Sequence, residues 1–109
     1  MMLTDQEFQQ RVDQTLETVF AKLAGASDDY DFDVDMNNGA LTVEFDEPRE
    51  RFVVSPNSPV KQIWVSAHVQ SYKFDWKPEA GTFVLLDSGQ TLEDLMVSAI
   101  QKRIPDFHL

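Results

Sequence analysis

The dipeptide Asn38-Gly39 stands between two segments whose apolar residues recur at every second position. Asn-Gly is a preferred sequence for the two-residue type I′ turn, which joins two antiparallel strands. Residues 31–36, before the turn, alternate between Asp and apolar residues, and residues 40–46, after it, alternate again. Alternation with a period of two is typical of a half-buried strand. The sequence therefore predicts a β-hairpin with one apolar face.

A two-residue turn also fixes which residues lie opposite one another in the hairpin. The apolar pairs are Met36 with Leu41, Val34 with Val43, and Phe32 with Phe45. The pairs on the other face are Asp35 with Thr42, Asp33 with Glu44, and Asp31 with Asp46. Because like charges directly opposite each other destabilise a sheet, this face indicates a requirement other than folding.

Carboxylates are hard oxygen ligands, and an open face of them suits weak, partly water-mediated binding of Fe²⁺, Mn²⁺, Ca²⁺ or Mg²⁺. The candidate ligands in the hairpin are Asp31, Asp33, Asp35, Glu44 and Asp46. Two alternatives involve no metal: a solvated acidic face, or protection of a sheet edge against further strand pairing. An EF-hand calcium loop is not expected, because Asn38 stands where that loop requires glycine and the flanks alternate like strands.

Helical periodicity marks the two ends of the chain. Thr4 and Glu7 form a capping box, so a helix is expected over residues 5–24 with Gly25 at its C-terminus. Thr91 begins a second helix, which Pro105 ends. The apolar stripes are Phe8, Val12, Leu16, Val19 and Leu23 in the first helix and Leu92, Leu95, Met96, Ala99 and Ile100 in the second.

Further strands are expected between the helices, separated by turns that contain Pro, Asn or Gly. Their predicted ranges are 51–55, 60–66, 72–76 and 82–86. Short turns imply antiparallel pairing, and both helices must bury their stripes against the sheet. The expected fold class is a two-layer α/β (α+β) sandwich: an antiparallel sheet of five to six strands with the N- and C-terminal helices on one face. We expect a single domain over residues 1–109.

The charge of the chain is segregated. The formal net charge of the chain is −10, and residues 1–47 carry all of it, with 12 acidic and 2 basic residues. Residues 48–109 contain 7 acidic and 7 basic residues and are neutral overall. Such a surface repels nucleic acid and anionic membranes and attracts cations or a basic protein face. With 0 cysteines, the chain forms no disulfide or thiolate site. The start, Met1-Met2-Leu3, resembles no signal or transit peptide, so we expect a cytoplasmic protein.

Trp64 is the candidate for an exposed aromatic contact. Ile63 and Val65 share one face of their strand, which leaves Trp64 on the other face if those two point at the helices. On the next strand the aromatics are expected in the core, which places Lys73 near Trp64. An exposed Trp among polar residues is typical of a protein interface. The alternative is a Trp covered by a loop.

No catalytic motif is present. His68 and His108 are the only histidines, far apart in the sequence and expected in a loop and a tail. A lone surface histidine without a structural context is more often inert than catalytic.

Several segments together resemble the frataxin family, as found in bacteria, and the likeness covers nearly the whole chain. The segments are Asp31–Asp35, Asn37–Val43, Ser58–Ser66, Tyr72–Trp76, Asp87–Gly89 and Leu92–Leu95. The most specific are the Pro-x-Lys-Gln-Ile-Trp run that ends at Trp64 and the Phe-Asp-Trp run that ends at Trp76.

The resemblance implies weak iron binding (Fe²⁺/Fe³⁺) along an acidic ridge, and docking on the cysteine desulfurase and the scaffold protein of iron–sulfur cluster assembly. By position, Asp31, Asp33 and Asp35 correspond to ridge ligands, with Asp28 and Asp29 nearby. The implied partner contacts are Asn57, Gln62, Trp64 and Lys73, with Glu17 on the first helix.

The chain also departs from the family pattern. Residues 21–25 lack the carboxylates usual at the end of the first helix, so iron affinity is expected to be lower or displaced toward Asp28 and Asp29. Lys73 stands where many members have Arg, which removes a bidentate donor. The short tail offers only Ile104, Phe107 and Leu109 to cover the groove between the helices.

Our leading hypothesis is a non-enzymatic, iron-binding regulator of iron–sulfur cluster assembly, mostly monomeric, with iron-dependent oligomers as an alternative. One rival is a ferroxidase or iron-storage protein, which would need close-set ligands. Another is an acidic protein-interaction module without a metal role.

Overall fold

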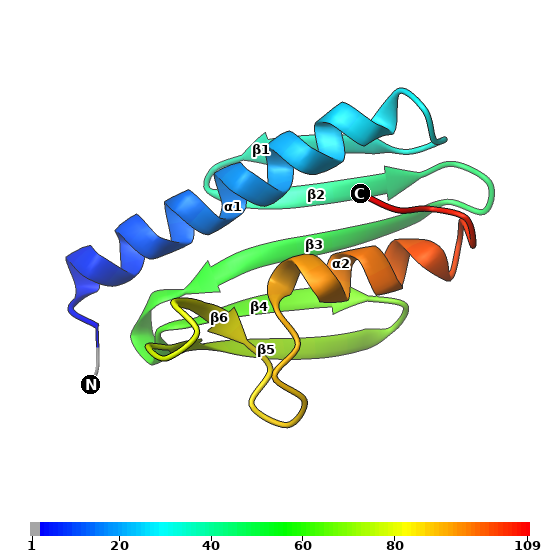
Figure 1. Cartoon of the computed structure of the whole chain (residues 1–109). Coiled ribbons are helices and arrows are strands. Elements are labelled where there is room, and N and C mark those ends of the chain that lie inside the picture. The colour runs from blue at the N-terminus through cyan, green and yellow to red at the C-terminus, as the bar shows by residue number, and fades with distance from the viewer. Residues whose placement is uncertain (1–2) are drawn as a thin grey trace.

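The structure, a computed structural model that describes residues 3–109, has two layers: a sheet, and two helices on one of its faces (Figure 1). All neighbouring strands are antiparallel, in the order β1-β2-β3-β4-β5-β6. The elements are α1 (Asp5–Ser27), β1 (Asp33–Asn37), β2 (Ala40–Phe45), β3 (Glu50–Asn57), the short 3₁₀ helix η1 (Ser58–Val60), β4 (Gln62–Ala67), β5 (Gln70–Lys77), β6 (Thr82–Val84) and α2 (Leu92–Gln101). The predicted fold class is confirmed. Met1 and Met2, on which the expectation of no leader partly rests, lie outside the described residues.

The first hairpin has the predicted turn and register. Asn38 and Gly39 both have positive φ, 54° and 81°, as a type I′ turn requires. The pairs from Met36↔Leu41 to Asp33↔Glu44 are those expected.

The predicted start of this strand at residue 31 is wrong, because β1 begins only at Asp33. The Phe32 amide donates to the Tyr30 carbonyl at 3.0 Å, so the backbone turns just before the strand. Asp31 and Asp46 are therefore not a strand pair, although the rings of Phe32 and Phe45 still meet with centroids 5.9 Å apart.

Both helices bury the predicted stripes against the sheet. The C-terminal part of α1 lies over β1 and β2 (Figure 1), whereas Phe8 near its start contacts Phe83 of β6, with ring centroids 5.9 Å apart. The predicted end of α1 at Gly25 is wrong. The helix runs through Gly25 to Ser27, whose hydroxyl donates to the Ala24 carbonyl at 2.9 Å, and Asp28 follows as a C-cap with φ −69°. Because no residue at this end adopts a left-handed conformation, the helix end does not require glycine.

The C-terminal tail closes the far end of the core. Phe107 is buried, with its ring centroid 4.8 Å from Tyr30 and 5.7 Å from Phe32. Phe107 therefore joins the segment after α1 to the segment after α2. Within residues 3–109, no helix has both the length and the apolarity needed to cross a membrane.

The boundaries of the middle strands differ from those predicted. Val60 lies in η1 rather than in a strand, and β5 begins at Gln70, two residues earlier than expected. His68 and Val69 form the turn between β4 and β5 with φ values of 52° and 59°. The tight form of this turn was not predicted, because no Asn, Asp or Gly stands here and Val69, a β-branched residue, rarely adopts positive φ.

The capping box at the start of α1 generates a pH prediction. The Thr4 amide donates to the Glu7 carboxylate at 2.9 Å and the Thr4 hydroxyl accepts from the Glu7 amide at 3.1 Å. The hydrogen bond from the Thr4 backbone, more than any other contact, lowers the pKa of Glu7 below its ordinary value. A lowered pKa in the folded state means stability that is present above the ordinary pKa and is lost as pH falls through the lowered one.

We therefore expect Glu7→Gln to make the free energy of unfolding less sensitive to acid than in the parent chain. Urea unfolding at a series of pH values measures this for Glu7→Gln, for the parent chain and for the control Glu79→Gln in the β5–β6 turn. Equal acid sensitivity of Glu7→Gln and the parent would contradict the prediction.

Candidate functional site

The carboxylates of the first hairpin lie on the face of the sheet that points away from the helices, here called the outer face. Asp33 and Asp35 are exposed on β1, and Glu44 is partly exposed on β2 opposite Asp33. Their orientation follows from alternation, since Val34 and Val43 point toward the helices. We call Asp33, Asp35 and Glu44 the acidic patch.

A cation partly offsets the like charges of this patch. Arg51 on β3 lies opposite Glu44, and its Nη2 atom is 3.2 Å from Oε1 of Glu44. Sequence reasoning missed this contact, because the loop from Asp46 to Arg49 did not reveal how β2 and β3 align. Asp33 and Glu44 therefore lie opposite each other as predicted, and Arg51 reduces the repulsion between their charges.

The other predicted metal ligands lie elsewhere. Asp28 is the C-cap of α1, and Asp29 follows it in the turn toward β1. Asp31 and Asp46 line a hollow of about 440 Å³ together with Lys102 and Arg103 from the end of α2. The structure thus divides the seven predicted ligands among three places, and the third contains two cations that compete with a metal ion.

The chemistry of these residues fits iron only as a loosely held ion. The acidic patch offers hard carboxylate oxygens, which suit Fe²⁺ and Fe³⁺. Across residues 3–109, no three Asp, Glu, His or Cys side chains converge closely enough to hold one ion among them. Binding through one or two carboxylates, with water completing the coordination, is what this arrangement allows.

The predicted partner contacts come together on the same outer face, except for one. Trp64 on β4 is 38% exposed, whereas Ile63 and Val65 beside it are buried. Lys73 on β5 lies opposite Trp64, with Nζ 5.0 Å from the centre of the indole ring, so the expected proximity of these two residues is confirmed.

Hydrogen bonds hold the indole in place. Trp64 Nε1 donates to Gln62 Oε1 at 2.9 Å, and Gln62 Nε2 donates to Asp75 at 3.1 Å. Asn57 at the end of β3 pairs with Gln62 across the strands. A positioned aromatic ring loses little conformational entropy when a partner packs on it.

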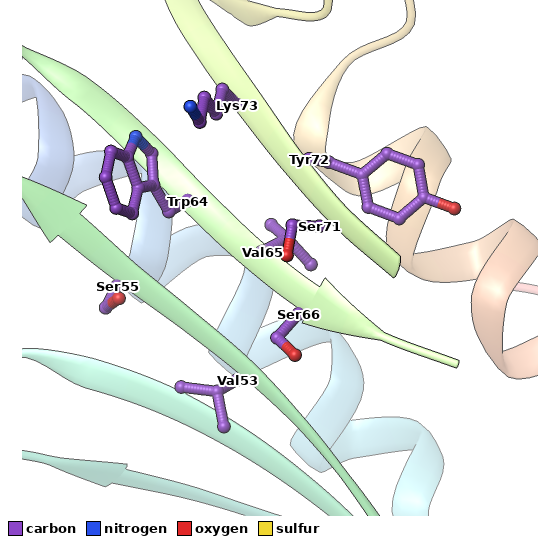
Figure 2. A pocket seen from close by; sticks show the side chains of 8 residues that line it. All are labelled: Val53, Ser55, Trp64, Val65, Ser66, Ser71, Tyr72 and Lys73. Atoms are coloured by element: carbon purple, nitrogen blue, oxygen red, sulfur yellow. The ribbon is translucent and has the colours of Figure 1, made fainter. Parts of the chain in front are cut away.

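A shallow hollow of about 250 Å³ lies beside the indole. Figure 2 shows Trp64 and Lys73 on neighbouring strands, with the small side chains of Ser55, Ser66 and Ser71 around them. Because large and small residues adjoin here, the surface can accept one apolar side chain of a partner.

Glu17 lies apart from these contacts, on α1 in the other layer. Lys22 faces α2, because its Nζ atom is 2.7 Å from Oε1 of Glu93. At 3.6 residues per turn, Glu17 lies about 140° away from Lys22 around the helix. Glu17 therefore points away from α2 and does not share a surface with Trp64.

Comparison with known proteins agrees with this fold. A family model described as a frataxin-like domain matches residues 1–106. The iron-sulfur cluster assembly protein CyaY of Azotobacter vinelandii is 30% identical over 109 residues, which cover 95% of this chain and 92% of that protein.

Two solved structures share the fold. Frataxin from Psychromonas ingrahamii gives a TM-score of 0.76 at 24% identity, covering 93% of this chain and 91% of its own. Yeast frataxin gives 0.72 at 23% identity, covering 94% of this chain and 85% of its own.

The contact between Arg51 and Glu44 generates a stability prediction. Arg51→Gln removes the cation that offsets the repulsion between Asp33 and Glu44, so the free energy of unfolding should fall by about 0.5–1 kcal/mol at low salt. Combining it with Asp33→Asn should restore most of that loss. Urea unfolding of the four chains of this double-mutant cycle gives the coupling energy, and strictly additive effects would contradict the prediction.

Proposed function

Because this chain belongs to the family of frataxin-like domains, we propose that it is an iron-binding accessory protein of iron–sulfur cluster assembly. In this proposal it docks on the cysteine desulfurase and scaffold protein of that machinery, in the bacterial cytoplasm. It regulates the machinery and has no active site of its own.

One observation carries the proposal: the outer face holds the acidic patch and Trp64 on a single surface. The acidic patch occupies β1 and β2, Trp64 and Lys73 occupy β4 and β5, and β3 lies between them. A partner that covers this face contacts both regions at once. Charge complementarity then governs the orientation and the rate of encounter, while Trp64 supplies contact energy.

The placement of the acids favours a cation. Asp33 lies opposite Glu44, and Asp28 and Asp29 follow the C-terminus of α1, whose last turn contains no basic residue. Carboxylates at that end of a helix are unfavourable, because they face the negative end of the helix dipole. A bound metal ion or the basic face of a partner relieves both costs.

Iron in this proposal is held weakly at the surface and exchanges readily. Carboxylate oxygens do not distinguish sharply among hard cations, so Mn²⁺, Ca²⁺ and Mg²⁺ should compete. The same acids serve the metal ion and a basic patch of the desulfurase.

The acidic patch can be tested by charge removal. Asp33→Asn with Asp35→Asn should weaken binding of both Fe²⁺ and the desulfurase roughly five- to thirtyfold, since each exposed charge contributes about 0.5–1 kcal/mol. Glu79→Gln with Asp87→Asn is a matched control, because it removes the same charge from the turns on either side of β6. Amide NMR titration with Fe²⁺ under anaerobic conditions, and calorimetry with the desulfurase, measure the two affinities. Equal losses in the control pair would assign the effect to net charge and sink the proposed patch.

Trp64 can be tested separately. Trp64→Ala should weaken binding of the desulfurase–scaffold complex by about 2 kcal/mol or more, as expected for a central aromatic contact, and leave Fe²⁺ binding unchanged. Trp64→Phe should keep most of the affinity, since it retains an aromatic ring. Undiminished binding by Trp64→Ala, with its fold intact by circular dichroism, would exclude this part of the outer face from the interface.

A further inference from the structure

His68 links three segments that are far apart in the sequence. Its Nδ1 atom lies 3.1 Å from Oε2 of Glu50 at the start of β3, and its Nε2 atom lies 2.8 Å from the carbonyl oxygen of Ala99 in α2. Arg103, just after α2, places Nη1 3.2 Å from the other oxygen of Glu50. These side chains are largely covered, with His68 21%, Glu50 26% and Arg103 15% exposed.

Both groups that face the ring nitrogens of His68 are hydrogen-bond acceptors. A backbone carbonyl can only accept a hydrogen bond, so a hydrogen bond at Nε2 requires a proton on that nitrogen. An ionised carboxylate is likewise only an acceptor, and Glu50 accepts from Arg103 through its other oxygen, so a hydrogen bond at Nδ1 requires a proton there as well. An imidazole with two donating nitrogens carries both protons and a positive charge.

The surroundings favour that cation. Ala99 lies in the last turn of α2, where carbonyls lack intrahelical donors and the helix dipole is negative. The rings of Phe52 and His68 also pack against each other, with centroids 4.8 Å apart and an interplanar angle of 66°. The charged groups that face the ring are Glu50 from β3 and, beyond it, Arg103. On its own hairpin the adjacent residues Ala67 and Val69 are uncharged.

A strained turn lies directly beside this network. Val69 has φ 59° and is fully exposed, and a β-branched residue at positive φ is a genuine outlier. Such strain persists only where surrounding contacts impose it. The strand pair Ala67↔Gln70 closes this turn, and the contacts of His68 tie it to β3 and α2.

We propose that His68, as an imidazolium, is a proton-dependent clamp that holds the β4–β5 turn against the C-terminal end of α2. Loss of one ring proton leaves either Oε2 of Glu50 or the Ala99 carbonyl without its donor from His68. The strained turn then loses an anchor, and the end of α2 with its tail loses a contact to the sheet. This role is independent of metal or partner binding on the outer face.

The direct test observes the ring nitrogens of the parent chain. In ¹⁵N-edited spectra of the folded protein at about pH 7, both nitrogens of His68 should show the shifts of protonated nitrogens. His68→Gln identifies which signal belongs to this ring. A His68 ring with one unprotonated nitrogen under these conditions would overturn the proposal, and this measurement does not depend on any variant being stable.

The thermodynamic test compares pH profiles. Between about pH 6 and pH 8, where histidine in an unfolded chain loses its charge, the folding equilibrium constant of the parent should fall more steeply with pH than that of His68→Gln. The sign follows because the folded state holds the proton that the unfolded state releases, so the extra stability is present at low pH and is lost as pH rises. His108→Gln, the same substitution in the exposed tail, should keep the parent's profile. Parallel profiles for the parent and His68→Gln would refute the clamp.

Discussion

The strict alternation of side chains across the sheet is the constraint on which the other features depend. Once the turn at Asn38 and Gly39 sets the register of the first hairpin, Val34 and Val43 must face the helices and Asp33 and Glu44 must face outward. A shift of one residue would bury the carboxylates and expose the core. The acidic patch and the exposed position of Trp64 are therefore consequences of one geometric rule, which applies to every strand of the sheet.

The outer face shows how function and stability oppose each other in this chain. Placing Asp33 opposite Glu44 and following α1 with Asp28 and Asp29 both destabilise the fold. Compensation comes from elsewhere: Arg51 pairs with Glu44, and the stripes of both helices are fully buried. Because the core is apolar and continuous, the surface can carry unfavourable charge without loss of the fold.

Much of this architecture could be predicted because it rests on local signals. The hairpin turn, the capping box and the helical stripes each depend on residues within a few positions of one another, and each was found where expected. The predicted end of α1 at Gly25 was wrong because a helix tolerates a single glycine in its interior. A turn was expected between residues 66 and 72, with His68 in it, but its tight two-residue form was not, because Val69 is not typical of positive φ and the contacts of His68 with Glu50 and Ala99 are distant in sequence. The division of the candidate ligands was missed for the same reason, since the position of Asp31 depends on how the tail and the end of α2 pack.

The order of the strands has a consequence for how the chain acquires its structure. Each strand pairs with the next one in the sequence, so the sheet can grow by closing one short loop at a time, at a small entropic cost for each step. The contact between Lys22 and Glu93 spans 71 residues and can form only after both helices have docked. During synthesis α1 leaves the ribosome before the strands do, so its apolar stripe stays uncovered until those strands have followed. The helix that packs on the acidic hairpin is thus made before that hairpin, and it can fold against the hairpin only once β1 and β2 have followed.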